Sequence, residues 1–523
     1  MDGFFKTLTD VNGAVNSFVW NYGLVILIGT GIIATIATRV FQITHIGEWF
    51  KATIGGLFKG KGRTKDDRGS VSQFQALCTA LAATIGTGNI AGVAAAIGTG
   101  GPGAVFWMWL AAFFGMMTNF SENVLGIYYR RKNEKGEWSG GPMYYLRDGL
   151  GKYKHCKGIG NVLAVIFSIC AILASFGIGN VGQVNKITIN LESAFLSNVD
   201  LGYVFGEVKW TSLIIGVVLM IIAGLVIFGG LQRIAATAEK LVPFMACAYV
   251  VGCLVIFFVN IGTIGDMFAA IFKFAFGAEA VVGGFTGIAV KEVITQGCKR
   301  GVFSNEAGLG SSVIVHSASS VKEPVVQGMW GIFEVFADTM VVCTMTAIVV
   351  LSSGAIDLQT GQFIGENADT LVAQSFGKIF GAPGEMFVAL CILMFAFTTV
   401  LGWSHYGTKA VEYLFGVKGG KIYRAIFVPV IVTGALMTSS IAWDISDTFN
   451  GMMMIPNLIG VLALMPVVIK ITRNYIDRKI KGKTDVAPML SAIPEIQNVY
   501  AAQVLMEEKE AKKIDLTERN FED

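Results

Sequence analysis

Charged residues are scarce in this chain, and so are the side-chain groupings that most enzymes use. Lys, Arg, Asp and Glu make up 15% of the 523 residues, whereas a typical soluble domain has about 25%. The four histidines are scattered, and the sequence holds no nucleophile–base constellation, metal-ligand cluster or phosphate-binding loop. These absences exclude an ordinary soluble domain and leave no enzyme signature. We expect neither an organic cofactor nor a nucleic-acid partner.

Paired cysteines and a leader sequence are also missing. None of the eight cysteines belongs to a C-x-x-C pair, and most lie in apolar segments. We therefore expect small buried side chains rather than disulfides or zinc ligands. The first ten residues, MDGFFKTLTD, lack the basic region and cleavage site of a secretory signal peptide, so none is expected.

Long apolar runs, in contrast, recur along the chain, and 53% of its residues are hydrophobic. Because a helix needs about 20 apolar residues to cross a bilayer, the sequence predicts an all-α polytopic membrane protein with eleven spans. The expected spans are Val19–Thr38, Gln73–Gly98, Ala104–Tyr129, Asn161–Ile189, Thr211–Ile227, Leu241–Val259, Ala280–Gln296, Gly328–Leu351, Gly384–Gly402, Ile422–Thr438 and Met452–Ile471. Two shorter stretches, Phe268–Phe276 and Leu371–Phe380, predict surface or re-entrant helices.

Basic residues alternate between loops and thereby predict the orientation. Lys and Arg gather after the first, third, fifth, seventh and ninth spans and again in the C-terminal tail. The loop after the seventh span is assigned Lys299, Arg300 and Lys322. Since cytoplasmic loops carry the excess of Lys and Arg, we expect a cell-membrane protein with its N-terminus outside and its C-terminus in the cytoplasm.

One glycine-rich stretch, Ala82–Gly92 (AATIGTGNIAG), lies inside the second predicted span. Its glycines each cost about 0.5–1 kcal/mol against alanine in a helix, and its Thr and Asn side chains compete for backbone hydrogen bonds. The stretch predicts a helix broken near mid-membrane, as in many secondary transporters. The alternative is close helix packing through small residues such as Gly88 and Gly92.

A second glycine-rich interruption, Gly283–Gly287 (GGFTG), lies in the seventh predicted span, which runs in the opposite direction. Two breaks of this kind predict an inverted repeat, with halves at 71–259 and 260–472. Residues 1–70 would add an extra first span and a basic loop, and 473–523 would form a cytoplasmic tail. The alternative is two unrelated clusters in a chain that has 64 glycines.

Polar side chains inside the predicted spans are the candidate site residues. The hydroxyls of Thr398 and Thr399 suit a hard cation such as Na⁺, or they bond to their own helix. Glu334 and Asp338 share one helix face. Asp338 is the candidate for coupling or proton handling, and the alternative is a structural partner for a buried polar group.

The segment ASFGIGNVGQVN in the fourth predicted span combines an aromatic ring with amides. Phe176, Asn180 and Gln183 there could close a pocket for a small molecule, whereas ordinary packing is the simpler interpretation of an aromatic membrane helix. Beyond the last span, Ile496–Lys513 could form a short amphipathic helix. The competing interpretation is a solvated tail without a role in transport.

Several long motifs together resemble the alanine or glycine:cation symporter family. They are ATIGTGNIAGVA in the second predicted span, GGPGAVFWMWLAAFFG from Gly100, SGGPMYYL from Ser139 and RGVFSNEAGLGSS from Arg300. The similarity extends from about Gln73 to about Ile471. It implies a fold of the leucine-transporter type, with five plus five inverted helices and one extra N-terminal helix. It also implies import of small neutral amino acids, chiefly alanine or glycine, by symport with Na⁺ or H⁺.

The resemblance also implies roles for individual residues. The amides of Thr87 and Gly88 would hold the substrate carboxylate, and Asn89 would lie near a second cation or the substrate amine. The carbonyls of Ala82 and Ile85 would form a sodium site with Thr398 and Thr399. The opposite wall of the site would comprise Gly283, Phe285, Thr286 and Gly287.

Two other functions compete with this interpretation. One is a proton-coupled or broader-range amino-acid transporter of the same fold. The other is a channel, which needs a continuous pore with repeated selectivity rings, and no ring-forming repeat is present in the sequence.

Overall fold

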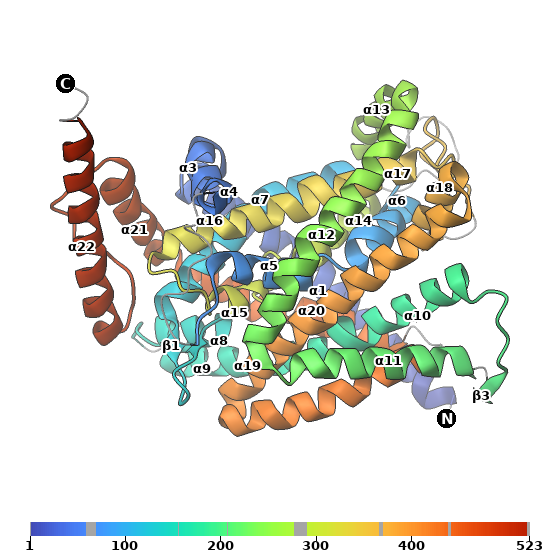
Figure 1. Ribbon diagram of the computed structural model, residues 1–523, viewed down its shortest axis with the longest axis horizontal. Coiled ribbons are helices and arrows are strands. Elements are labelled where there is room, and N and C mark those ends of the chain that lie inside the picture. Colours follow the sequence, from blue (N-terminus) through green and yellow to red (C-terminus); the bar gives the residue numbers. More distant parts are fainter. Residues whose placement is uncertain are drawn as a thin grey trace.

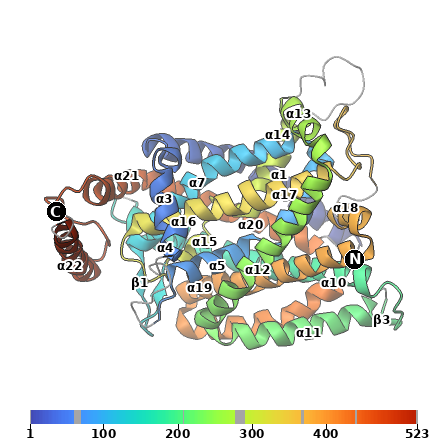
Figure 2. The same ribbon diagram turned by 45° about the horizontal axis from the view of Figure 1, so that its top comes forward.

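The computed structural model describes residues 2–58, 69–154, 156–206, 208–276, 290–365, 370–437 and 441–519. Helices dominate this part of the chain, and Figure 1 shows them packed side by side in one body. The described strands form two small antiparallel pairs: β1 (Arg131–Lys132) with β2 (Trp138–Ser139), and β3 (Tyr203–Phe205) with β4 (Val208–Lys209). The two chain ends lie at opposite ends of the body in both views (Figures 1 and 2).

The first half of the chain forms the following helices. They are α1 (Asp2–Ala37), α2 (Phe41–Thr44), α3 (Ile46–Ala52), α4 (Ile54–Phe58), α5 (Gln73–Thr84), the π-helical turn η1 (Gly88–Gly92), α6 (Val93–Gly100), α7 (Ala104–Tyr129), α8 (Pro142–Tyr145), η2 (Leu146–Leu150), α9 (Lys157–Phe176), η3 (Gly177–Val181), α10 (Gly182–Phe195), α11 (Trp210–Ile227) and α12 (Gly230–Val259). Ser72 and Gln75 form a capping box that fixes the start of α5.

The second half continues with shorter and longer helices in alternation. They are η4 (Ile261–Thr263), α13 (Ile264–Ala275), α14 (Val290–Asn305), α15 (Ser312–His316), α16 (Pro324–Val335), η5 (Phe336–Cys343), α17 (Thr344–Leu351), α18 (Leu371–Phe380), α19 (Ala382–Leu436), α20 (Ile441–Ala463), α21 (Met465–Tyr475), η7 (Ile476–Ile480) and α22 (Pro494–Arg519). The two short apolar stretches of the sequence lie in α13 and α18, neither of which is long enough to span.

Seven helices of the described chain are long and apolar enough to cross a membrane, or nine if each of two bent pairs counts as one span. The bent pairs are Gln73–Thr84 with Gly88–Gly100, at 55°, and Asp444–Ala463 with Met465–Ile480, at 58°. The chain is therefore a helical multi-pass membrane protein, and the count of eleven spans stays a prediction.

The ninth predicted span lies in α19, and so does the tenth as far as Leu436. This element has 55 residues and is interrupted at Gly416, where φ is 73° and ψ is 179°. A straight helix of that length would measure roughly 80 Å, far more than the roughly 30 Å of a hydrocarbon core. Gly416 adopts a backbone conformation that only glycine reaches easily, and it divides α19 into two arms, which are orange in Figure 1.

The seventh and eleventh predicted spans do not end where helices end in the structure. The seventh predicted span ends at Gln296, whereas α14 continues to Asn305, so Lys299 and Arg300 are helical and do not belong to a loop. The reason is that Lys299 has a partner inside the fold: its Nζ lies 2.8 Å from Oδ2 of Asp447 in α20.

The eleventh predicted span, Met452–Ile471, runs across a bend. In the structure α20 ends at Ala463 and α21 begins at Met465. Pro466 lies in the first turn of α21, where proline is tolerated because its missing N–H has no helical partner. The apolar run continues through the bend, so hydropathy alone does not reveal it.

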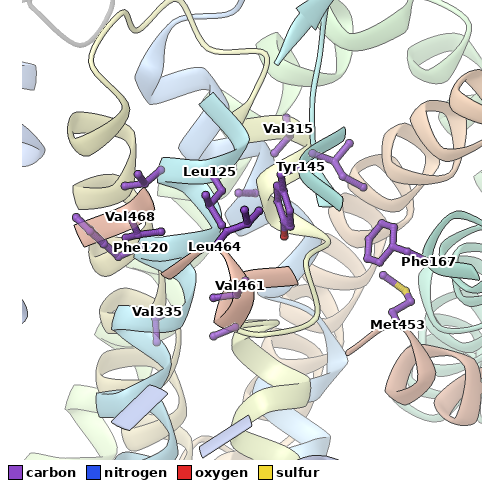
Figure 3. Packing of buried hydrophobic residues seen from close by; sticks show 14 of the residues in the cluster. Phe120, Leu125, Tyr145, Phe167, Val315, Val335, Met453, Val461, Leu464 and Val468 are labelled. Carbon is purple, nitrogen blue, oxygen red and sulfur yellow. The ribbon is translucent and has the colours of Figure 1, made fainter. Parts of the chain in front are cut away.

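A large apolar core joins helices of the first half of the chain to helices of the second half, and Figure 3 shows its packing from close by. Its labelled members come from α7, α8, α9, α15, α16, α20 and α21 and from the α20–α21 bend: Phe120, Leu125, Tyr145, Phe167, Val315, Val335, Met453, Val461, Leu464 and Val468. The side chain of Leu464 fills this core directly at the bend. The core therefore ties the bent α20–α21 pair to α7.

Close packing of α14 against α7 generates a stability prediction. A Cβ atom on Gly297 would lie 2.3 Å from the carbonyl oxygen of Ala104, so Gly297→Ala forces the two helices apart. Overpacking of this kind costs about 1–3 kcal/mol, and we expect a lower thermal unfolding midpoint in detergent. The control is Gly29→Ala in α1, where no atom lies within 4 Å. An equal midpoint for the two variants would contradict this packing.

Candidate functional site

The predicted break in the second span is present, at Ile85–Thr87. Ile85 leaves helical geometry, with φ −74° and ψ 89°. The N–H of Gly86 donates to Oδ1 of Asn89 at 2.9 Å, and the N–H of Thr87 donates to Oε1 of Gln183 at 3.3 Å. Side chains therefore replace the helical acceptors that these two amides have lost.

A cavity of about 630 Å³ reaches this break. Thr87 and Gly88 line it together with Gly92, and α10, α14 and the end of α19 supply further wall. It extends past Asn185 and Glu192 to Lys209 in β4. The cavity thus leads from the middle of the first broken helix toward the end of the molecule that carries β3 (Figure 1).

Thr87 is the one polar side chain at the break that lines this cavity. It is 4% exposed, and its Oγ1 has no hydrogen-bond partner within the described chain. A buried hydroxyl without a partner costs about 1–3 kcal/mol. Thr87 is therefore a candidate to donate to, or accept from, a bound molecule.

A second break separates α14 from α15, at residues 306–311. Glu306, Gly308 and Gly310 there have φ values of 55°, 90° and 78°. Glu306 accepts hydrogen bonds from Ser311 Oγ and, at 3.0 Å, from Trp403 Nε1. The sequence placed the second break at Gly283–Gly287, which lies outside the described residues. The motif NEAGLGS, with its two glycines, is the signal that marks the break observed here.

The two broken helices lie antiparallel. The pieces α6 and α14 pack against each other, and so do the pieces α5 and α15. The N–H of Val71, before α5, donates to the carbonyl of Ala318, after α15, and the N–H of Ser320 donates to the carbonyl of Val71. The start of one broken helix therefore lies beside the end of the other, which is the arrangement of an inverted repeat.

Asp338 joins the two broken helices. It is fully buried in η5, and its Oδ1 accepts from Asn89 Nδ2 at 2.7 Å. Its Oδ2 accepts from Ser304 in α14 at 2.6 Å and from Thr339 at 2.9 Å. The structure therefore brings together Asn89 and Asp338, two of the residues singled out in the sequence, and adds Ser304, which the sequence analysis missed.

Thr399 lies against the first break. A Cβ on Gly86 would lie 2.6 Å from Thr399 Oγ1 and 3.3 Å from Gln183 Oε1. Both Thr399 and Thr398 donate to the carbonyl of Phe395, which is the local bonding expected of a helical threonine. Each hydroxyl oxygen keeps lone pairs for a cation.

The other three predicted cation ligands have different surroundings. Ala82 and Ile85 are buried at the end of α5, which packs against α19. A Cβ on Gly402 of α19 would lie 2.6 Å from the Cβ of Ala83. Thr398 instead has Met245 of α12 as a neighbour, with 3.7 Å between Oγ1 and Sδ.

Of the remaining predicted site residues, two do not line the cavity and four lie outside the described residues. Phe176 packs against the rings of Tyr423 and Phe427 and does not line the cavity at the first break. Asn180 donates to the carbonyl of Phe427. Gly283, Phe285, Thr286 and Gly287 lie outside the described residues.

Three more fully or almost fully buried carboxylates surround the second break: Glu334, which the sequence singled out beside Asp338, and Glu122 and Glu306, which it did not assign to the site. Glu122 accepts from Asn457, which also donates to the carbonyl of Gly308 at 2.8 Å. Glu334 lies 2.9 Å from His316 Nε2, and Glu306 caps the break as described above. A buried carboxylate in a membrane helix is costly without partners, so these contacts fix the helices around the second break.

Together these features define the class of membrane protein to which the chain belongs. Two antiparallel broken helices, with side chains holding the freed backbone and a cavity leading to one break, are the architecture of a secondary transporter. The crystal structure of MhsT in complex with L-phenylalanine has the same fold: the TM-score is 0.51, at 12% sequence identity, covering 79% of this chain and 99% of that one.

The chain belongs to the sodium:alanine symporter family, whose pattern matches residues 5–488. The sodium/alanine symporter AgcS of Methanococcus maripaludis is 44% identical over 468 residues, 88% of this chain and 96% of the relative. The amino-acid carrier protein AlsT of Bacillus subtilis is 33% identical over 502 residues, 95% of this chain and 98% of the relative. The family resemblance of the sequence motifs is thereby confirmed.

The Asp338 cluster generates a prediction about transport. Asp338→Asn removes a charged acceptor of three hydrogen bonds, and each such bond contributes about 1.5–3 kcal/mol. We expect uptake of the labelled amino-acid substrate into proteoliposomes to fall about tenfold or more. Cys343→Ala is the control, because its sulfur touches the same Asn89 and Ser304 through weak contacts of 3.5 and 3.1 Å. A similar loss in both variants would refute a specific role for the carboxylate.

Proposed function

We propose that this protein imports small neutral amino acids, chiefly alanine or glycine, by symport with Na⁺ and by alternating access. The observation that carries the proposal is the break at Ile85–Thr87, which opens on a cavity at Thr87 and Gly88. The helical segment Gly88–Gly100 starts at this point, so the positive end of its dipole lies beside the cavity that Gly88 lines. The N–H of Thr87 already donates to Gln183, so a bound carboxylate would compete with that side chain for this amide. A carboxylate is the group that such a helix start binds best.

The walls of the cavity favour a small substrate. The ring of Phe303 lies against Gly88, and a Cβ on Gly88 would be 3.1 Å from its Cδ1. With the carboxylate at the helix start and the Thr87 hydroxyl beside it, Phe303 limits the room for a side chain. Asn89 and Gln183, which hold the amides of the break, would place the substrate amine or a second cation nearby.

The proposed sodium site lies behind the break. It comprises the carbonyls of Ala82 and Ile85 with the hydroxyls of Thr398 and Thr399, a set of oxygen ligands that suits a hard cation. The contact of Thr399 with Gly86 supports this placement. Asp338 is the proposed coupling residue, since its contacts with Asn89 and Ser304 join the two broken helices.

Alternating access follows from this arrangement. In the described structure the cavity leads from Thr87 toward β4, while backbone hydrogen bonds between Val71 and residues 318–320 close the other end. The proposed orientation, N-terminus outside and C-terminus cytoplasmic, makes this an outward-facing state. The two chain ends lie at opposite ends of the body (Figure 2), in agreement with an odd number of crossings.

Sodium coupling can be tested directly. Replacing external Na⁺ by choline at fixed pH is expected to abolish accumulation of labelled alanine in proteoliposomes. Thr398→Ala combined with Thr399→Ala should raise the Na⁺ concentration needed for half-maximal uptake by about tenfold or more, because each lost charged contact contributes about 1.5–3 kcal/mol. Thr408→Ala, which removes a hydroxyl bonded to Ser404 on the same helix, is the control.

The choline and threonine experiments also separate the alternatives. Uptake that is unchanged in choline but follows a proton gradient would replace Na⁺ by H⁺ in this proposal. Flux that never accumulates alanine against its gradient would favour a channel over a transporter.

Substrate size provides a further test. Phe303→Ala enlarges the cavity beside Gly88, so valine and leucine should then compete with labelled alanine, which they should not do in the unaltered protein. Phe176→Ala removes an aromatic ring that does not line the cavity, and we expect no change in the competition panel. The idea that Phe303 sets the size limit would fail if both variants kept the original range.

A further inference from the structure

The C-terminal helix α22 is docked on the body of the protein. Its residues Ile496 and Tyr500 pack against a cluster of Val71, Ala76, Trp138, Ala235 and Ala318. Gln497 anchors the segment before the helix by accepting from the N–H groups of residues 490 and 491, and the N–H of Ala492 donates to the carbonyl of Tyr128 in α7. The interpretation of this region as a solvated tail therefore does not describe the structure up to Glu508.

The docking surface includes the inner ends of both broken helices. Val71 directly precedes the capping box of α5, and Ala318 lies two residues beyond the end of α15. The N–H of Val71 donates to the carbonyl of Ala318, and the carbonyl of Val71 accepts from the N–H of Ser320. Ile496 and Tyr500 of α22 pack on the cluster that contains Val71 and Ala318. Figures 1 and 2 place α22 and α21 at the end of the molecule opposite β3 and α18.

Arg130, at the end of α7, links α22 to the same point. Its guanidinium is 1% exposed and donates to the carbonyls of Ser317, Ser319 and Val321. It also stacks on the ring of Trp138, at 4.2 Å, and lies 3.4 Å from the hydroxyl of Tyr500. The chain that follows α15 is thus held by α7 and α22 together.

Ion pairs add a second attachment. Arg478 in η7 donates to both oxygens of Glu323, at 2.8 and 2.9 Å, and to Glu508 of α22 at 2.9 Å. Lys322 pairs with Glu507 at 2.7 Å. Burial raises the pKa of Glu323, and the neighbouring Arg478 opposes that rise. The segment between α15 and α16 is therefore connected to α22 through the buried guanidinium of Arg478, which contacts both Glu323 and Glu508, and through the more exposed pair of Lys322 with Glu507.

We propose that α22 is a latch that keeps the cytoplasmic ends of the two broken helices together, so that inward opening requires its release. This rests on the alternating-access function proposed above. Separation of α5 from α15 breaks the Val71 hydrogen bonds and pulls Val71 and Ala318 away from Ile496 and Tyr500. The docked tail thereby stabilises the outward-facing state and slows the passage of cargo to the inside.

A truncation after Ile493, which removes α22, tests the latch. The matched control is a truncation after Glu508, which keeps every contact named here. The reporter is Ala95→Cys, which places a thiol in the wall of the outer cavity. It is introduced into the full-length and the truncated proteins. Cys156 and Cys247, the two native cysteines that are not buried, are replaced by serine in all of them. Reaction with a membrane-impermeant maleimide added outside reports the outward-facing population.

Removal of α22 is expected to slow labelling of the reporter by about threefold or more, because the population shifts to the inward-facing state. The truncation after Glu508 should label as fast as the full chain. Equal labelling of both truncations, in protein that remains monodisperse, would overturn the latch.

Point variants cover the case in which the long truncation does not fold. Tyr500→Ala removes the contacts with Trp138 and Arg130 and should slow labelling in the same direction. Val499→Ala, at an exposed neighbouring position, should not. Labelling equally fast in both variants would also refute the proposal.

The labelling experiment needs no knowledge of the cargo, so its failure is distinguishable from failure of the proposed function. A shift in labelling without Na⁺-driven alanine uptake would support the proposed role of α22 and refute the proposed substrate and coupling ion. Na⁺-driven uptake with unchanged labelling would retain the function and discard the latch.

Discussion

Backbone groups that lie deep in a membrane need partners from within the protein, because the hydrocarbon offers none. This constraint governs both breaks. At the first, Asn89 and Gln183 accept from the amides of Gly86 and Thr87. At the second, Asn305 accepts from the N–H of Ala307, and Asn457 donates to the carbonyl of Gly308. Each break therefore depends on one side chain close to it in the sequence and on one from a distant part of the chain.

The same polar side chains connect the breaks to the buried acids. Asn89 reaches Asp338, and Asn457 reaches Glu122. A change in the geometry of either break therefore changes the surroundings of a buried carboxylate. In a medium of low polarity such a change is energetically large, which is a physical basis for coupling an ion to the conformation of the helices.

The sequence predicted helix bounds well where sharp signals mark both ends, as in α7, whose bounds Ala104–Tyr129 match and which lies between GGPG and the basic run RRK. It failed where charged residues lie within a helix, because the partner that neutralises Lys299 is Asp447, 148 positions further along the chain. The first break was predictable because its glycines and polar residues are local. The contact of Asn89 with Asp338, which are 249 positions apart, is a product of the fold and is not visible in any local pattern.

The N-terminal helix α1 has a mechanical consequence for the second broken helix. Asn16 of α1 donates to Asp447 of α20, and the same carboxylate oxygen pairs with Lys299 of α14. Three helices are thereby joined at one oxygen atom, and α14 is fastened on its outer side. Beyond the break, α15 is only five residues long. The long arm of the second broken helix is thus fixed by α1 and α20, so movement of the short arm α15 relative to it requires release of the hydrogen bonds from Arg130 to the chain that follows α15.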